Sequence, residues 1–167
     1  EIDAVGRRNT GTSIRFWPSP NYFDSIKISS GRLRHLLKAK AVLCPGLKIK
    51  FLDEHDDRSD EWYFEDGLFE YLTANMVEDL ALPNPPVTGG LKSRDGEVEW
   101  GIYWSIEPAE LLRESYVNLI PTINGGTHLS GMKQGLVEAL RDFIESRNLM
   151  PRGLKITAED VAENCAY

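Results

Sequence analysis

The feature that most constrains the fold is an apolar stripe between residues 129 and 144. A helix with one apolar face is stable in water only when that face is buried against another layer of structure. The stripe therefore predicts a long helix whose apolar residues are core residues packed on a sheet. Its members recur at spacings of three, four and seven residues: Leu129, Met132, Leu136, Val137, Leu140, Phe143 and Ile144.

A turn containing Gly125 and Gly126 leads into this helix through Thr127 and His128. Exposed N–H groups at the start of a helix attract anions, so the turn could bind one. It could also be structural, with glycines for backbone freedom, Thr127 as the N-cap and His128 held in the first turn. We favour the structural interpretation, because the phosphate-loop pattern G-x-x-x-x-G-K-[ST] does not occur in the sequence.

Other segments predict the remaining layers. Residues 31–44 and 68–76 have helical patterns, and Pro45-Gly46 ends the first of these helices. Its basic residues Arg34, Lys38 and Lys40 are interpreted as a solvated face rather than a binding patch. Alternation of apolar and polar side chains predicts strands at residues 11–17, 47–53, 62–64, 98–106 and 115–122. The strands at 47–53 and 62–64 are expected to form a hairpin.

Prolines and glycines crowd residues 82–97, which predicts irregular structure there and a domain boundary between Met76 and Pro86. Near the C-terminus, residues 153–157 predict a short strand, and Thr157 with Asp160 predicts a capped turn. The pattern as a whole predicts an α/β chain, α+β in two layers.

Charge and cysteine content limit the classes of function. The net charge of −7 excludes a uniformly basic nucleic-acid surface but leaves room for a local basic patch. Cys44 and Cys165 have no neighbours at zinc-ligand spacing and are expected to be reduced, as in a cytosolic protein. No apolar run is long enough to span a membrane, so we expect a soluble, cytoplasmic protein without a membrane partner.

No pattern in the sequence supports catalysis or a metal site. The nucleophile-elbow pattern G-x-S-x-G is absent, and the three histidines, at positions 35, 55 and 128, have no companion ligands. Adjacent acids occur at Glu65-Asp66 and Glu159-Asp160, but neighbouring side chains diverge on a strand or a helix, so neither is a natural acid–base pair.

Long blocks of the sequence nevertheless resemble one family. The blocks "RNTGTSIRFWPS", "LRHLLKAKAVLCPGLKIKF", "WYFEDGL", "YVNLIPTINGGTHLSGMKQGL" and "PRGLKITAEDV" are similar to the ATPase subunit of bacterial type IIA DNA topoisomerases. The resemblance covers essentially the whole chain. It is stronger to the B subunit of topoisomerase IV than to the B subunit of gyrase, because "KAKAVLCPG" matches the topoisomerase IV version.

This resemblance implies a fold and an activity. Residues 1–76 would be the C-terminal portion of a GHKL-type ATPase domain, and residues 77–167 the start of a ribosomal-protein-like transducer domain. The parent enzyme would use ATP and Mg²⁺ to close a homodimeric gate around one DNA duplex and pass it through a break in another. Its partner would be the A subunit of topoisomerase IV, in a heterotetramer associated with the nucleoid.

Site residues also follow from the resemblance. Thr12 and Ile14 would line the adenine pocket, both pointing from one strand toward the nucleotide. Lys133 falls where gyrase-type sequences carry an arginine that faces the cavity for transported DNA. Lysine keeps the attraction to phosphate but lacks the planar fork of arginine.

Other parts of the family's machinery have no match in this sequence. The magnesium-binding asparagine, the adenine-reading aspartate and the glycine-rich lid are expected before Glu1, and the switch lysine after Tyr167. The sole glutamine, Gln134, is not in a Gln-Thr-Lys motif. We therefore expect a fragment that is inactive alone. The alternative is a stand-alone protein-docking module of the same fold.

Overall fold

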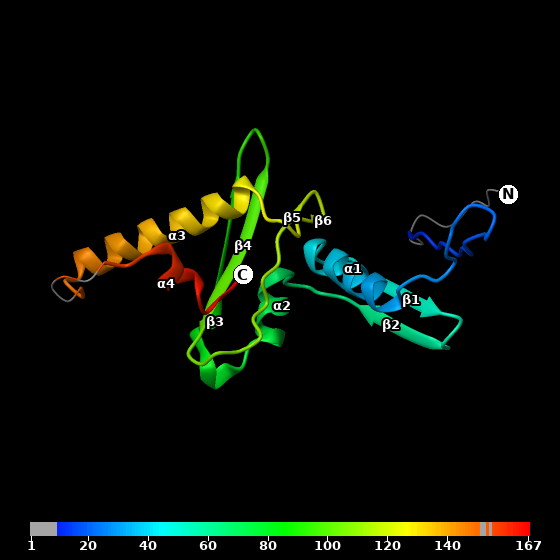
Figure 1. Ribbon diagram of the computed structural model, residues 1–167, viewed down its shortest axis with the longest axis horizontal. Coiled ribbons are helices and arrows are strands. Elements are labelled where there is room, and N and C mark those ends of the chain that lie inside the picture. The colour runs from blue at the N-terminus through cyan, green and yellow to red at the C-terminus, as the bar shows by residue number, and fades with distance from the viewer. Residues whose placement is uncertain (1–9, 151–152, 154) are drawn as a thin grey trace.

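The computed structural model describes residues 10–150, 153 and 155–167. The molecule is elongated, with a small hairpin and α1 toward one end and α3 toward the other (Figure 1). The α+β class predicted from the sequence is confirmed. The elements follow in the order α1 (Ser30–Leu43), β1 (Ile49–Asp53), β2 (Arg58–Trp62), α2 (Leu68–Asn75), a 3₁₀ turn (Glu78–Leu80), β3 (Ala81–Lys92), β4 (Glu97–Ser105), β5 (Tyr116–Val117), β6 (Ile120–Pro121), α3 (Thr127–Ser146), α4 (Ala158–Ala162) and β7 (Cys165–Ala166).

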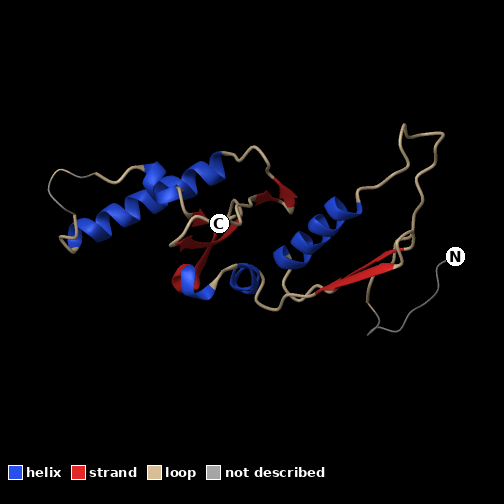
Figure 2. Cartoon of the chain, turned by 60° about the horizontal axis from the view of Figure 1, so that its bottom comes forward, coloured by secondary structure: helices blue, strands red, loops and turns tan. Residues whose placement is uncertain are grey.

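The first half of the chain is α1 packed on the antiparallel hairpin of β1 and β2, which both ribbon views show side by side (Figures 1 and 2). Ser29 starts the helix, because its side chain accepts a hydrogen bond from a backbone N–H of the first turn at 3.4 Å. Ala41 and Val42 are buried in a cluster with Phe64 and Tyr71. The first helix and the hairpin are therefore confirmed.

The second strand of the hairpin begins earlier than expected. Residues 62–64 were predicted, whereas β2 is Arg58–Trp62. The register places Lys50 opposite Glu61, and the Glu61 carboxylate lies 2.9 Å from the Lys50 ammonium and 2.7 Å from that of Lys48. Cross-strand charge pairs of this kind let a polar segment form a strand whose outer face is in water.

The basic residues of α1 are tied to the protein, so their interpretation as a freely solvated face is wrong. Arg34 Nε donates to Asp60 Oδ2 at 2.6 Å. Lys38 Nζ lies 5.0 Å from the centre of the Tyr71 ring. Lys40 Nζ donates to the carbonyl of the residue before β6. These side chains join α1 to its own hairpin, to α2 and to the β5–β6 turn.

Residues 81–92 form a long strand, so the irregular structure predicted for residues 82–97 is wrong. The sheet order is β3-β4-β7, which makes β3 an edge strand, where proline is tolerated. Pairing with β4 is interrupted between Leu82 and Val87. The prolines lie in this interruption, where no N–H is needed for the ladder: Pro83, Pro85 and Pro86.

The single strand predicted at 115–122 is also wrong, because the chain forms the tight hairpin of β5 and β6 instead. Asn118 and Leu119 connect the two strands with φ angles of 47° and 67°. Two consecutive residues in the left-handed region make the kind of turn whose twist matches a two-residue hairpin. The turn presents the carbonyl of Leu119 to Lys40.

The central sheet is covered on both faces. On one face, Trp104 Nε1 of β4 donates to the carbonyl of Val161 in α4 at 2.7 Å. On the other face lies α2, whose Leu72 is 2% exposed. Strand neighbours alternate between faces, so each layer contacts its own set of β4 side chains. Leu72 belongs to a buried cluster with Ala81, Tyr103 and Ala166.

The long helix α3 is confirmed, but its N-cap and its packing differ from expectation. Its N-cap is Gly126, with no side-chain cap hydrogen bond, so Thr127 as N-cap is wrong. Of its residues, all of them described, Val137 alone is buried, and Phe143 is 51% exposed. The main partner of α3 is the short helix α4 rather than the sheet, and a short helix covers only part of a long stripe.

The turn before α3 has the backbone geometry for which glycines were expected. Gly125 has a φ angle of 71°, which few side chains tolerate. A Cβ at Gly126 would lie 2.8 Å from the His128 ring, so this ring covers the glycine backbone. His128 Nε2 lies 3.3 Å from Thr122 Oγ1, which ties the helix start to the segment after β6.

The C-terminal cap is confirmed. Thr157 and Asp160 form a reciprocal capping box at the start of α4, and hydrogen bonds from Thr157 lower the pKa of the Asp160 carboxyl. The short strand predicted over residues 153–157 is wrong for the described part of that range, which has no strand. Residues 151, 152 and 154 lie outside the described residues. β7 then pairs with β4, placing Ala166 opposite Tyr103.

Candidate functional site

Two of the predicted site residues lie in a segment without regular structure. No strand forms over residues 11–17, so the strand expected to carry Thr12 and Ile14 is wrong. Ile14 is 79% exposed, and no strand among the described residues pairs with its segment. Alternation alone cannot hold a strand without a partner ladder. The adenine-pocket role of both residues stays a prediction.

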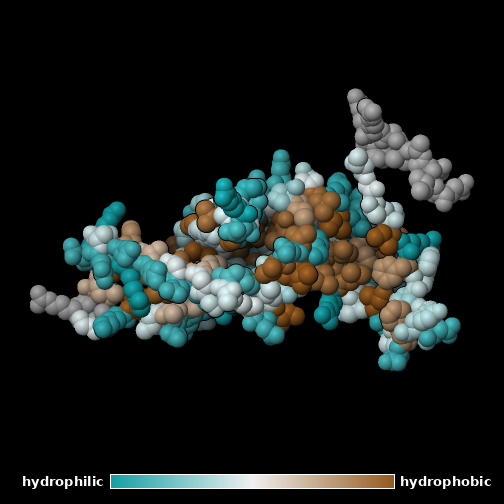
Figure 3. Space-filling model, turned by 90° about the horizontal axis from the view of Figure 1, so that it is seen from above, coloured by the Kyte–Doolittle hydropathy of each residue, from teal (hydrophilic) through white to brown (hydrophobic). Residues whose placement is uncertain are grey.

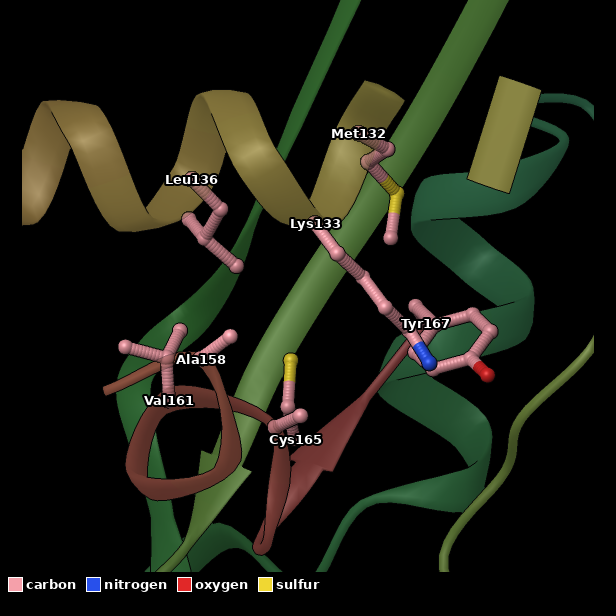
Figure 4. Close-up of a pocket in the computed structure, with 8 residues that line it drawn as sticks. Met132, Lys133, Leu136, Ala158, Val161, Cys165 and Tyr167 are labelled. Carbon is pink, nitrogen blue, oxygen red and sulfur yellow. The ribbon is translucent and has the colours of Figure 1, made fainter. Parts of the chain in front are cut away.

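Lys133 lies on α3, whereas Thr12 and Ile14 lie in the segment before α1, so the structure does not bring the predicted site residues together. Its ammonium sits 5.1 Å from the centre of the Tyr167 ring, a cation–π contact. Figure 4 shows Lys133 reaching from α3 toward Tyr167, beside Met132 and Cys165, at a crevice between α3, α4 and β7. Its proposed contact with DNA stays a prediction.

The structure shows a polar cluster, missed by the sequence interpretation, where the two halves of the chain meet. Its centre is Glu114, in the connection between β4 and β5. Glu114 Oε1 lies 3.4 Å from His35 Nε2 of α1 and accepts a hydrogen bond from the Tyr71 hydroxyl of α2 at 3.5 Å. Glu114 Oε2 accepts from the Tyr116 hydroxyl of β5 at 2.8 Å. One carboxylate therefore contacts three elements.

The sequence held only a weak signal for this cluster. Residues 107–113 read as a short linker, and an acid between a linker and a strand is typically solvated. In the structure the Glu114 side chain is 20% exposed. Two of its partners, His35 and Tyr71, are distant along the chain, so no local spacing could have indicated them.

Backbone contacts hold this linker in place. Glu114 N donates to the carbonyl of Tyr167 at 2.9 Å, and Tyr167 N donates to the carbonyl of Leu112 at 2.9 Å. Arg113 donates through Nε to the carbonyl of Cys165 at 3.1 Å and through its terminal nitrogen to carbonyls at the end of α4. Leu112 packs against the buried clusters of both halves. The linker is thus fixed to the sheet on one side and to α1 and α2 on the other.

A cleft of about 340 Å³ lies beside this cluster. Space-filling spheres show apolar side chains gathered along the middle of one face, between the more polar ends of the molecule (Figure 3). The cleft itself has mixed walls, with acidic, basic, hydroxyl and apolar groups. It is lined by His35, Arg113, Glu114, Ser115, Tyr116, Pro121, Thr122, Ile123, Gly125, Leu129 and Tyr167.

The tyrosines of the cluster are expected to ionise at unusually high pH. Burial, followed by the Glu114 charge, raises the pKa of Tyr71 to about 12, and burial with the Glu114 hydrogen bond also raises the pKa of Tyr116. Unfolded tyrosines ionise near pH 10. The folded state therefore holds these protons more tightly, and the stability this contributes is present below about pH 10 and lost as the pH rises toward about 12.

Tyrosinate absorbance during an alkaline titration measures this directly. Tyr71→Phe and Tyr116→Phe should each remove one late-titrating group. Tyr22→Phe is the control, since Tyr22 is 84% exposed, and it should leave the late phase intact. One common titration phase in all of these variants would contradict the buried, acid-bonded positions of Tyr71 and Tyr116.

The described residues contain no group of three or more His, Cys, Asp or Glu side chains placed to hold a metal ion. Both cysteines, Cys44 and Cys165, are free thiols. None of the helices in the described part of the chain has the length and apolarity of a membrane span. Of the adjacent acids Glu159-Asp160, Asp160 caps α4. Of the pair Glu65-Asp66, the Glu65 backbone N–H donates to the Glu70 carboxylate.

Comparison with known families shows to which family this chain belongs. The family model for DNA gyrase B matches residues 51–167. The chain belongs to the DNA gyrase B family. Within the family it is 54% identical over 166 residues to the B subunit of DNA topoisomerase 4 from Pseudomonas aeruginosa and 50% identical over 167 residues to that from Escherichia coli. The B subunit of DNA gyrase from Helicobacter pylori is 29% identical over 170 residues.

These alignments cover 99%, 99% and 98% of this chain, respectively, but the chain spans only 26%, 26% and 21% of those relatives. The resemblance to the B subunit of topoisomerase IV, with that of gyrase next, is confirmed.

Solved structures of the family share this fold. The topoisomerase IV ATP-binding domain of Francisella tularensis, in complex with a small-molecule inhibitor, matches with a TM-score of 0.74 at 40% identity. That match covers 99% of this chain and 44% of the other. The ATPase domain of Thermus thermophilus gyrase B, in complex with an aminocoumarin, matches with a TM-score of 0.69 at 27% identity, covering 89% of this chain and 40% of the other.

Proposed function

We propose that this chain is part of the ATP-hydrolysing subunit of a type IIA DNA topoisomerase of the topoisomerase IV kind. The observation that carries the proposal is the 54% identity, over 99% of the chain, to the B subunit of a DNA topoisomerase 4. In this role the chain couples ATP binding to closure of a homodimeric gate and passage of a DNA duplex. The parent protein acts in the cytoplasm on the nucleoid, with the A subunit of topoisomerase IV in a heterotetramer.

The domain division supports a coupling role. We place residues 1–76 in the ATPase domain and residues 77–167 in the transducer domain. Two buried clusters meet at α2, one containing Tyr71 with α1 and the hairpin, the other containing Leu72 with the sheet. The adjacent residues Tyr71 and Leu72 both lie on α2, next to the proposed boundary. α2 thus contacts both domains and can transmit movement between them.

The nucleotide and its Mg²⁺ would bind mainly to parts of the parent protein other than this chain, with Thr12 and Ile14 lining the adenine pocket. The exposed apolar side chains around them support this proposal, since a surface of this kind is usually covered. They are Ile14, Phe16, Trp17, Tyr22 and Phe23. Accordingly, the chain 1–167 alone is expected to turn over no ATP.

One experiment tests the function and the role of Lys133 together. The parent protein with its partner subunit should separate interlinked DNA circles only when ATP is present. Lys133→Glu should lower the DNA-stimulated ATPase rate several-fold and leave the basal rate unchanged, because the reversed charge repels phosphate. If Lys133 contacts phosphate, the salt dependence of DNA binding should also weaken, with a slope smaller by roughly one.

Lys27→Glu is the matched control, since Lys27 is exposed and lies in the N-terminal half of the chain. It should leave both rates as in the wild type. Decatenation without ATP, or none from a folded heterotetramer, would refute the proposed function. An equal loss of basal and stimulated rates in Lys133→Glu would refute the DNA contact alone.

A further inference from the structure

Glu114 is the one acidic residue of its linker whose side chain binds groups from both halves of the described chain. Glu107 and Glu110, in the same linker, are exposed. The Glu114 side chain is 20% exposed, and each of its two carboxylate oxygens contacts a different half of the chain. Oε1 faces His35 and Tyr71 of α1 and α2, whereas Oε2 faces Tyr116 of β5.

We propose that Glu114 is a positioning residue that couples the ATPase half of the chain to the transducer half. This inference rests on the proposed function. When α1 and α2 shift on nucleotide binding, the Glu114 carboxylate carries the shift to β5 and, through the linker backbone, to the sheet. The residue does not touch nucleotide or DNA in this account. It sets how strongly events at one site change the rate at the other.

A carboxylate suits this task because it only accepts hydrogen bonds. The Tyr116 hydroxyl donates to one of its oxygens at 2.8 Å and the Tyr71 hydroxyl to the other at 3.5 Å, so one carboxylate contacts both tyrosines. Charge-assisted hydrogen bonds are about twice as strong as neutral ones. Two elements bound to one charged group therefore move together more readily than two elements in apolar contact, which can slide.

The linker backbone extends this connection to the central sheet. Glu114 N donates to the carbonyl of Tyr167, which directly follows β7, and Arg113 binds three carbonyls between α4 and β7. A displacement of the Glu114 side chain thus reaches α4, on which α3 packs. A second bond across the same junction, from Lys40 to the carbonyl of Leu119, keeps α1 close to the β5–β6 turn.

The test uses the full-length protein in complex with its partner subunit. Glu114→Ala should reduce the ratio of DNA-stimulated to basal ATPase by about tenfold, the size expected from one charge-assisted hydrogen bond. The basal rate, the KM for ATP and the melting temperature of the ATPase half should stay close to wild type. Glu110→Ala is the matched control and should leave the ratio unchanged.

Variants that change only one contact of Glu114 test the inference even if Glu114→Ala does not fold. Glu114→Gln retains one acceptor oxygen and should lower the ratio of DNA-stimulated to basal ATPase less than Glu114→Ala does. Tyr116→Phe removes the hydrogen bond between β5 and Glu114 and should also lower this ratio. In a double variant with Glu114→Gln the two effects should be less than additive, because both act through one contact.

The outcomes separate this inference from the proposed function. A wild-type enzyme that does not separate interlinked DNA circles in an ATP-dependent way would contradict the proposed function. A decatenating enzyme whose Glu114→Ala, Glu114→Gln and Tyr116→Phe variants keep the wild-type ratio overturns the inference alone. So does a fall of basal and stimulated rates by the same factor, which would mean that Glu114 only supports folding.

Discussion

Leu72→Ala is expected to lower the free energy of unfolding by about 2–5 kcal/mol. Leu72 is 2% exposed and fills the space between α2 and the sheet, where it meets Ala81, Tyr103 and Ala166. Removing its branched end leaves a cavity that the sheet cannot close, because β4 is held between β3 and β7. Urea unfolding measures the loss. Leu91→Ala, at a position 70% exposed, should change it by less than about 0.5 kcal/mol.

The same contact can be tested from the sheet side. A Cβ at Gly101 of β4 would lie 2.3 Å from the end of the Leu72 side chain, so Gly101→Ala should destabilise the protein by about 1–3 kcal/mol through overpacking. In the double variant the new methyl group occupies space that Leu72→Ala vacates. The double variant should therefore be more stable than the sum of the two single changes predicts. Simple additivity would contradict the packing of α2 on β4.

Local signals predicted much of the fold. The helical pattern at residues 31–44 ends before Pro45-Gly46, so α1 was predicted almost to its ends. The Thr157–Asp160 cap depends on residues three apart and was predicted as well. Both features are decided by neighbours within one turn of chain, which a sequence displays directly.

Long-range pairing decided the elements that were predicted wrongly. Prolines exclude a central strand but not an edge strand, and the edge position of β3 depends on where β4 and β7 lie. The apolar stripe of α3 gave the helix correctly, yet its burial depends on the size of its partner, and α4 has only five residues. Alternation at residues 11–17 likewise gave no strand, because no described segment pairs with it.

The candidate site could not be predicted for the same reason. Glu114 lies 43 residues from Tyr71 along the chain, so the contact exists only once α2 and the linker have folded together. The resemblance to topoisomerases directed attention to Thr12 and Ile14, before α1, and to Lys133, on α3. The resemblance assigned no role to the residues of the Glu114 cluster.

The central claim is that this chain holds a junction between two bodies that move relative to each other when ATP binds. In the first body α1 packs on the β1–β2 hairpin, in the second β3, β4 and β7 form the central sheet, and α2 contacts both. Between them lie the polar contacts of Glu114 and Lys40 and the apolar packing of α2, through Tyr71 and Leu72, in the buried clusters of both halves. Relative motion of domains is the default expectation unless their interface is large and hydrophobic. The Glu114 contacts would transmit such a motion to β5.

Electron-spin distance measurements on the full-length protein test this claim most directly. Labels at Arg32→Cys of α1 and Asp142→Cys of α3 report across the junction, in a background whose other cysteines are replaced. The pair at positions 32 and 59 reports within the first body, and the pair at positions 95 and 142 within the second. We predict that a non-hydrolysable ATP analogue shifts the 32–142 distance and leaves the other two unchanged. An unchanged 32–142 distance in a protein that binds the analogue would contradict the account.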